Sequence, residues 1–472
     1  MLQYRGKSYN TYQEYLAAVR EPTTTTPATQ YTYVPPSTQY TYVTPAEEVV
    51  DASVDEARTK LYVRGLSGLK NQGNTCYMNS ILQCLSAISI FRACLTNDEH
   101  FMTKLYYNML IRLGDEKRKK ESIPNDVSVK VPKTLLTESC NNTIVYRLAE
   151  LFGVMWKQNA TVTPKNFKKT VGEYCSTFSG YSQNDSQELL NLILDKIHEE
   201  LKSEVKVIFQ NVPESVNNYL QVKMQCSEKI NDEIISLEEK QKYLDYLQNY
   251  TAEHKNDAIT SEAYLYWRNY IRRSHSVITD LFTGLFYSKI TCSECNSVTG
   301  SFEPFTMLSL PTKEDGETTL EESLNSFVKE ELLTGDNKYS CSECKKKVDA
   351  NKKMHIWSPP NILIVQLKRF KNDSWRTTKT SSKVVFPIKN MDIKNYLSDL
   401  HTVEKTTYDL VAISEHRGSC NSGHYVAYCK NDINDKWYEF NDDDIFHVPY
   451  DDLDKEIITK NAYILFYVRN IN

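Results

Sequence analysis

Four cysteines arranged as two short pairs place the strongest constraint on this chain. Cys292 and Cys295 form one C-x2-C pair, Cys341 and Cys344 form a second, and 45 residues (296–340) separate the pairs. This spacing is longer than in a compact zinc finger, but it suits ligands at the tips of two separate β-hairpins. Four thiolates in this pairing are typical of a closed tetrahedral site, so we expect one structural zinc ion. The alternative is four thiols without a metal.

The composition is that of a globular protein without a charge bias. Of the 472 residues, 40% are hydrophobic, and the formal net charge of -5 gives no basic excess for nucleic acid or anionic membrane surfaces. The first residues, MLQYRGKSYN, lack the apolar core of a signal peptide, and no stretch approaches the roughly 18 apolar residues that span a bilayer. We therefore expect a cytoplasmic or nuclear protein with no nucleic-acid or membrane partner. Its twelve cysteines are then free thiols, metal ligands or a nucleophile.

Three parts of the chain differ in composition and in the spacing of their apolar residues. Residues 1–58 are predicted to be a disordered tail with a near-repeat, TQYTYVPPS then TQYTYVTPA, and a short amphipathic helix is expected at 11–20. Residues 61–470 have the composition and apolar patterning of one globular domain. Within it, residues 203–265 are rich in Lys, Glu, Asn and Gln, with apolar residues at helical spacing, which predicts a helical insertion. The tail either folds weakly or not at all, or it is a partner-binding peptide. The insertion either packs against its own domain or forms a coiled-coil site for a partner.

Cys76 stands where a glycine-punctuated loop changes into a helix. From Cys76 onward, apolar residues recur at helical spacing up to Leu85. At a helix N-terminus, unpaired backbone N–H groups and the helix dipole stabilise a thiolate, which is the attacking form. Cys84 lacks this position and is expected to be a buried apolar residue. Asn71 lies in the preceding loop, where its side-chain amide can donate to the oxyanion of a tetrahedral intermediate, or can simply stabilise the loop.

Near the C-terminus, two aromatic and apolar segments flank a polar turn and predict a β-hairpin. A turn centred between residues 432 and 433 places His424 opposite Asn441, whereas a turn centred on 433 places it opposite Asp442. A thiol, a histidine and an amide or carboxylate form the usual arrangement for acyl transfer, in which the third group fixes the imidazole tautomer. We therefore expect a cysteine hydrolase with Cys76 as nucleophile and His424 as general base.

Five segments of the chain, in order, resemble sequence blocks of the ubiquitin-specific proteases. The segment 68–85 resembles their cysteine box and 408–444 their histidine box, while 180–190, 278–286 and 360–370 resemble three blocks between them. The resemblance implies an α+β, papain-like cysteine protease fold with a helical thumb, a β-rich palm and zinc-bearing β fingers. It also implies a thiol-dependent deubiquitinase, which hydrolyses the isopeptide or peptide bond after the C-terminal glycine of ubiquitin. Its partners would be ubiquitin and ubiquitinated proteins, with no catalytic cofactor.

The resemblance also assigns roles to individual residues. Asn71 would be the oxyanion donor and Asn441 the third member of the triad, with Asp442 as a substitute or an assistant. The family uses either Asp or Asn at the Asn441 position, and with Asn the orienting role remains but the negative charge is lost. The four paired cysteines would belong to the fingers, which grip the globular body of ubiquitin.

Two carboxylates in the 180–190 block can also be interpreted from their spacing, independently of the resemblance. Asp185 and Glu188 stand at helical spacing, which places both on one face of a helix predicted over 185–201. The resemblance implies that they pair with arginines in the basic tail of ubiquitin, whereas two such carboxylates alone indicate only a solvated surface.

Two other functions fit the same residues. One keeps the chemistry but cleaves a ubiquitin-like modifier, and the other is an inactive ubiquitin-binding scaffold that recruits partners through the tail and the insertion. The scaffold is disfavoured because no triad position carries a disabling residue.

Overall fold

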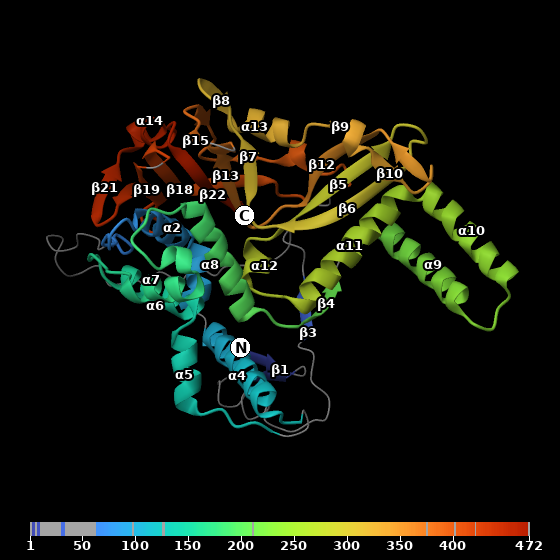
Figure 1. The fold of residues 1–472 in the computed structure, drawn as a ribbon, viewed down its shortest axis with the longest axis horizontal. Helices are drawn as coiled ribbons and strands as arrows, with labels where there is room; N and C mark the ends of the chain where they lie inside the picture. The colour runs from blue at the N-terminus through green and yellow to red at the C-terminus, as the bar shows by residue number, and fades with distance from the viewer. Residues whose placement is uncertain are drawn as a thin grey trace, which may run out of the picture.

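The computed structural model describes residues 2–4, 7–9, 30–33, 63–96, 99–124, 128–209, 212–373, 376–400, 403–420 and 422–470. In Figure 1, helices from the first half of the chain pack beneath a β-rich second half, and a pair of helices projects from one end. The structure therefore has the three parts that the sequence predicts, which we call thumb, palm and fingers.

The thumb is a bundle of helices. Its bounds are α2 (Cys76–Ala87), α3 (Ser89–Thr96), α4 (Glu99–Glu121), α5 (Lys133–Asn141), α6 (Ile144–Lys157), α7 (Lys165–Tyr174), α8 (Ser186–Leu201) and α12 (Val277–Leu281). Apolar residues three and four apart on α2, α6 and α8 form the main hydrophobic core. Glu200 of α8 fixes the start of α6, because its carboxylate accepts hydrogen bonds from the backbone N–H groups of Ile144 and Val145 at 3.0 and 2.9 Å.

The palm is an eight-stranded sheet that carries the C-terminal half of the site. Its strands run in the order β21-β20-β19-β18-β22-β13-β7, with β17 paired to β18. Their bounds are β7 (Leu308–Pro311), β13 (Ile362–Lys368), β17 (Met391–Asp392), β18 (Thr407–Ser419), β19 (Ser422–Lys430), β20 (Trp437–Asn441), β21 (Asp444–Val448) and β22 (Ala462–Arg469). Alternate residues face opposite sides, so one face joins the thumb core and the other forms a second core.

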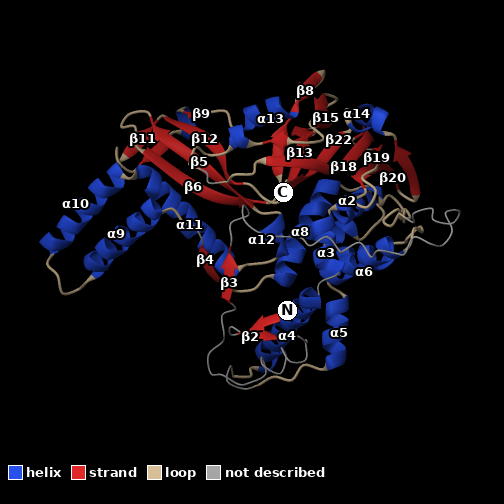
Figure 2. Ribbon diagram, turned by 180° about the vertical axis from the view of Figure 1, so that it is seen from behind, coloured by secondary structure: helices blue, strands red, loops and turns tan. Residues whose placement is uncertain are grey.

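The second core packs against short elements on the outer side of the palm. These are β8 (Glu317–Thr319), α13 (Leu320–Phe327), β16 (Lys383–Val385) and α14 (Leu453–Ile457). A hairpin of β14 (Phe370–Asp373) and β15 (Arg376–Lys379) follows β13. Figures 1 and 2 both place α13 and α14 along the edge of the palm away from the thumb helices.

The fingers are a four-stranded sheet with a small hairpin at its tip. The sheet order is β6-β5-β12-β9, with β5 (Gly284–Cys292), β6 (Val298–Phe305), β9 (Glu331–Leu333) and β12 (Ala350–Ser358). The hairpin pairs β10 (Tyr339–Cys341) with β11 (Lys346–Val348). Each cysteine pair thus lies at a strand end and the turn that follows it, as expected for ligands at hairpin tips.

The segment 203–265 contains β4 (Lys206–Phe209), α9 (Glu214–Asn231), α10 (Leu237–Glu253) and most of α11 (Lys255–Arg273). Trp267 and Ile271 of α11 pack on the fingers beside Tyr287 and Phe302. In contrast, α10 has no buried residue, and the α9–α10 hairpin projects away from the body (Figure 2).

In the tail, three short strands are described: β1 (Leu2–Tyr4) and β2 (Lys7–Tyr9) pair with each other, and β3 (Gln30–Tyr33) pairs in parallel with β4. The helix predicted at 11–20 lies outside the described residues, as does most of the tail predicted to be disordered.

Within the described residues, no single helix is long and apolar enough to cross a membrane, and only α2 with α3, bent by 89°, meets the criteria as a pair.

Candidate active site

Cys76 is the first residue of α2, as the loop-to-helix transition predicts. It is only 4% exposed, and the backbone carbonyl of Thr75 accepts the first helical hydrogen bonds, from Met78 and Asn79. The thiol therefore lies at the positive end of the helix dipole, beside backbone N–H groups without a helical acceptor. Cys84 is fully buried on the same helix, and burial raises the pKa of its thiol well above the ordinary value. The two cysteines of α2 thus differ as the sequence indicates.

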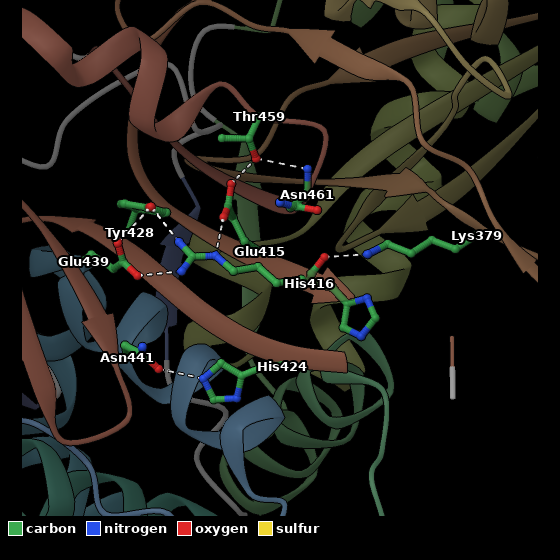
Figure 3. Close-up of polar contacts among 10 residues, drawn as sticks. Lys379, Glu415, His416, His424, Tyr428, Glu439, Asn441, Thr459 and Asn461 are labelled. Carbon is green, nitrogen blue, oxygen red and sulfur yellow. Dashed lines mark hydrogen bonds and ion pairs between the residues drawn. The ribbon is translucent and has the colours of Figure 1, made fainter. Parts of the chain in front are cut away.

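His424 on β19 reaches Asn441 at the end of β20. Its Nε2 lies 2.6 Å from Oδ1 of Asn441, and Figure 3 shows the imidazole pointing at that amide. Because an amide oxygen only accepts, Nε2 carries the proton and Nδ1 is left for a second partner. Among the candidates, Asn441 is thus the residue in contact with the imidazole.

The hairpin forms, but the predicted register is wrong. Ala427 pairs with Phe440 and Lys430 with Trp437, so neither Asn441 nor Asp442 lies directly opposite His424. The β19–β20 ladder ends at the Ala427–Phe440 pair, β20 itself ends at Asn441, and Asp442 adopts a left-handed conformation with φ of 54°. The Asn441 side chain therefore reaches His424 diagonally.

Cys76 changes the proton affinity of His424. The pKa of His424 is raised to about 9, first by a hydrogen bond with Cys76 and then by Asn441, against an opposing effect of burial. A thiol and an imidazole in this relation favour a thiolate–imidazolium pair.

Asp442 contacts two asparagines rather than the histidine. Its Oδ2 accepts a hydrogen bond from Nδ2 of Asn71 at 2.9 Å, and its Oδ1 accepts one from Nδ2 of Asn79 at 2.8 Å. The backbones also meet, because the N–H of Leu69 donates to the carbonyl of Asp442 at 2.8 Å. Gly68 permits this approach, since a Cβ there would lie 2.3 Å from the carbonyl oxygen of Asp443. The segment before Cys76 is thereby fixed to the segment after Asn441.

Asn71 is oriented from both ends of its amide. While Nδ2 donates to Asp442, Oδ1 accepts hydrogen bonds from the backbone N–H groups of Gly73 and Thr75 at 2.9 and 3.2 Å. One hydrogen of Nδ2 remains for another acceptor.

A polar network also ties together the strands that carry His424 and Asn441. Arg417, the register partner of His424, donates to Glu415 on its own strand, to Tyr428 on β19 and to Glu439 on β20, at 3.3, 2.7 and 2.8 Å. Figure 3 labels Glu415, Tyr428 and Glu439 of this network together with the His424–Asn441 contact. It fixes the spacing of β18, β19 and β20.

The two carboxylates of the 180–190 block have different surroundings. Asp185 is the N-cap of α8: its Oδ1 accepts from the backbone N–H of Gln187 at 2.7 Å, and both its oxygens accept from the Tyr463 hydroxyl at 3.0 and 2.9 Å. Burial raises its pKa. Glu188 lies in the first turn of α8 and is exposed.

Cys292, Cys295, Cys341 and Cys344 come together at the tip of the fingers. Their four Sγ atoms lie within 4.8 Å of one another, with 3.8 Å between Cys292 and Cys344 and 3.7 Å between Cys295 and Cys341. A tetrahedral zinc with Zn–S bonds of about 2.3 Å needs S···S distances of about 3.8 Å. The backbone N–H of Cys344 donates to Sγ of Cys341, which helps to lower the pKa of Cys341 to about 6. The cluster can therefore bind a zinc ion.

A family model described as ubiquitin carboxyl-terminal hydrolase matches residues 67–467. The chain belongs to the ubiquitin carboxyl-terminal hydrolase family. The predicted resemblance to ubiquitin-specific proteases and the α+β thumb, palm and fingers fold are thereby confirmed, as is the assignment to thiol-dependent deubiquitinases, which are cysteine-type hydrolases.

Relatives of this hydrolase differ in how much of their length it matches. It is 30% identical to a probable ubiquitin carboxyl-terminal hydrolase of Acanthamoeba polyphaga mimivirus, over 89% of this chain and 93% of that protein. It is 31% identical to ubiquitin carboxyl-terminal hydrolase 2 of Rattus norvegicus, over 86% of this chain but only 54% of the relative. Among solved structures, the SAGA Ubp8/Sgf11/Sus1/Sgf73 DUB module bound to ubiquitin aldehyde matches 87% of this chain and 70% of that chain. Its TM-score is 0.52 at 24% identity, which supports the fold.

Two residues of the hydrolase site escaped the sequence reasoning. Asn79 looks like one polar residue within an apolar helix, yet it is buried and contacts Asp442. Gln183 of the thumb reaches the palm, where Nε2 donates to the carbonyl of Gly423 at 3.1 Å. A buried asparagine on the core face of α2 was the available signal for the first, whereas the second depends on the tertiary fold.

Proposed function

We propose that the chain hydrolyses the bond after the C-terminal glycine of ubiquitin through a triad of Cys76, His424 and Asn441. The observation that carries the proposal is the Asn441 contact with Nε2 of His424 together with the effect of Cys76 on the pKa of that histidine. The contacts orient the imidazole toward the thiol, which is the relation that acyl transfer requires.

The first half of the reaction transfers the ubiquitin acyl group to Cys76. The thiolate attacks the glycine carbonyl carbon, and the electron pair of the C=O bond moves to oxygen. The backbone N–H of Cys76 and the remaining hydrogen of Asn71 Nδ2 donate to this oxyanion. As the C–N bond breaks, the imidazolium of His424 gives its Nδ1 proton to the leaving amine, which leaves a thioester and a neutral imidazole.

The second half regenerates the thiolate. His424 takes a proton from water, the hydroxide attacks the thioester carbonyl, and the C–S bond breaks to release the C-terminal carboxylic acid of ubiquitin, which loses its remaining proton to solvent. In this scheme Asp442 is a positioning residue, because it contacts Asn71 and Asn79 rather than the reacting atoms.

The proposal extends to the substrate contacts, the metal and the location. Glu188 is exposed and available to the basic tail of ubiquitin, with Asp185 behind it at the helix N-cap. The cysteine cluster would hold one structural zinc without a catalytic role, since four protein ligands leave no open position. A cytoplasmic or nuclear location is proposed because the nucleophile and this cluster both require reduced thiols.

We also propose that the α9–α10 hairpin contacts a partner protein. The proposal is supported by Ile234 and Leu237 at its tip, which are 93% and 84% exposed. Lysine at both positions should reduce binding to that partner but leave ubiquitin hydrolysis unchanged, and a lower rate of ubiquitin hydrolysis would point to a substrate contact instead.

The test of the main proposal is a ubiquitin probe with a thiol-reactive C-terminus. One covalent adduct should form, disappear in Cys76→Ala and persist in Cys84→Ala, which serves as the matched control on the same helix. An adduct that survives Cys76→Ala would overturn the assignment. Competition with ubiquitin-like modifiers in a cleavage assay separates ubiquitin from those alternatives, and complete absence of an adduct and of turnover would favour the scaffold.

A further inference from the structure

A surface cavity lies on the outer side of the palm, away from the candidate active site. It has a volume of about 570 Å³ and is formed by α13, the segment 385–396 and α14. The cavity opens onto the second hydrophobic core, whereas Cys76 contributes to the first. Its size falls within the range of roughly 300–1,000 Å³ that ligand sites occupy. Nothing in the proposed hydrolysis uses it.

The floor of the cavity is apolar. It includes side chains that are less than a tenth exposed, namely Leu320, Leu324, Phe386, Met391 and Ile458. These residues belong to a packed core and keep their places without a ligand. The floor is therefore preformed and would accept an apolar side chain.

The rim of the cavity is acidic. Glu321, Asp392 and Asp454 come from three separate segments, and no lysine, arginine or histidine is among the described residues that line it. Asp392 accepts hydrogen bonds from the backbone N–H of Lys394 and the hydroxyl of Thr406. The carboxylates of Glu321 and Asp454 have no hydrogen-bond or ion-pair partner among the described residues. Their negative field is free to attract a cation.

A tyrosine hydroxyl completes the lining. Tyr396 is only 4% exposed, lines the cavity, and donates no hydrogen bond to any described residue. Burial and the Glu321 carboxylate raise its pKa, so the hydroxyl stays protonated and can donate. With no acceptor on the described part of the protein, this hydroxyl is left to donate to water or to a ligand. A backbone carbonyl of a bound peptide would supply that acceptor.

We propose that this cavity docks a linear segment of a partner protein that presents an apolar side chain beside lysine or arginine. The apolar side chain would fill the floor, the cationic groups would pair with Glu321 and Asp454, and a peptide carbonyl would accept from Tyr396. A peptide meets all three features at once, whereas a neutral apolar ligand leaves the carboxylates unpaired. The proposal concerns a second binding surface and does not depend on the triad assignment.

The test is methyl NMR of the full chain labelled at its methionine methyl groups. The probes are the acetylated, amidated tripeptide Lys-Phe-Lys and its acidic counterpart Glu-Phe-Glu. The Met391 resonance, assigned by its loss in Met391→Leu, should shift saturably as the basic peptide is added. The acidic peptide should bind with an affinity at least about tenfold lower.

Substitutions test whether Glu321 and Asp454 bind the cationic groups of the peptide. Glu321→Lys and Asp454→Lys should each weaken binding of the basic peptide by about fivefold, the value of one modest ion pair, and Tyr396→Phe should also weaken it. Glu456→Lys makes the same charge change on α14 outside the cavity, and it should leave binding unchanged. All four variants should hydrolyse a ubiquitin substrate at the normal rate, which shows that they are folded.

Three outcomes would overturn the proposal. The first is a Met391 resonance that moves with neither peptide, and the second is equal binding of the basic and acidic peptides. The third is phenethylammonium binding as tightly as the basic tripeptide, which would make the cavity a small-molecule site instead of a docking surface.

Discussion

The carboxylate of Asp442 holds the side chain of Asn71, across 371 residues of sequence, with 2.9 Å between Oδ2 and Nδ2. The other oxygen of Asp442 accepts from Asn79 on α2. One carboxylate thus joins the loop before the nucleophile, the helix that the nucleophile begins and the strand end that carries Asn441. This relation gives Asp442 and Asn441 separate tasks, which substitutions can distinguish.

We predict that Asp442→Asn lowers kcat by about tenfold to a hundredfold with a much smaller change in KM. The amide replaces one of the two accepting oxygens with an NH₂ donor, so it faces the NH₂ group of one asparagine with a second donor, and the fixed orientation of Asn71 toward the oxyanion is disturbed. Steady-state kinetics with ubiquitin joined to a fluorogenic amine measures both constants. Asp443→Asn, an exposed neighbour, is the matched control. A rise in KM at constant kcat would show that Asp442 acts in substrate binding instead.

Substitutions of Asn441 should follow the need for an acceptor at Nε2 of His424. Asn441→Ala removes the acceptor, and kcat/KM should fall by about tenfold or more because the imidazole loses its tautomer and orientation. Asn441→Asp keeps an oxygen at the same place and should retain most of the activity. Equal losses of kcat/KM in Asn441→Ala and Asn441→Asp would contradict an orienting role for Asn441. A larger loss in Asp442→Ala than in Asn441→Ala would make Asp442 the third member of the triad.

The pH dependence follows from the raised pKa of His424. Because its pKa is about 9 in the fold against an ordinary 6.5, the imidazolium persists to alkaline pH, and kcat/KM should fall as pH rises through about 9. The same sign applies to folding: the contribution of this group is complete below about 6.5 and is lost as pH rises through 9.

The hydrogen bond with Cys76 is the largest cause of that raised pKa. An NMR titration of the histidine ring should therefore give a lower pKa for His424 in Cys76→Ala than in the unmodified chain. An unchanged value would mean that the thiol and the imidazole do not interact.

Local sequence identified the nucleophile and the base because each lies in a segment whose own pattern determines its structure. The loop before Cys76 and the apolar spacing after it predict the helix start that is observed. The aromatic and apolar segments around His424 predict its strands equally well. The register between them was not predicted correctly, because Lys430 pairs with Trp437 and the turn 431–436 is therefore centred between 433 and 434. A polar turn predicts a hairpin more reliably than it fixes the ladder that the turn closes.

Contacts between distant segments were harder to predict. Asp442 appeared to compete with Asn441 for His424, since spacing along a strand does not reveal Asn71 and Asn79 on the other side. The acidic rim of the outer cavity likewise joins Glu321, Asp392 and Asp454 from three segments. Such features arise from packing, and no single segment carries their pattern.

The cysteine cluster leads to a prediction about stability and substrate affinity. Beyond its thiols, the tip of the fingers has a very small core, in which Val348 packs beside Tyr339. A metal would therefore reinforce the few contacts between the tip of β5 and the β10–β11 hairpin, such as the ion pair of Glu294 with Lys346. We expect about one zinc per purified chain by elemental analysis. A zinc content far below one would contradict the site.

Removal of that zinc should loosen the fingers without disabling the chemistry. Four thiolates at S···S distances of 3.7–3.8 Å repel one another without a cation, so a chelator should lower the unfolding temperature. If the fingers grip ubiquitin, KM should rise more than kcat falls. Cys341→Ser should reproduce both effects, whereas Cys175→Ser, a partly exposed cysteine outside the cluster, should reproduce neither. Equal metal content and stability in the two variants would show that the four thiols hold no zinc, and a selective loss of kcat would place the metal in the chemistry.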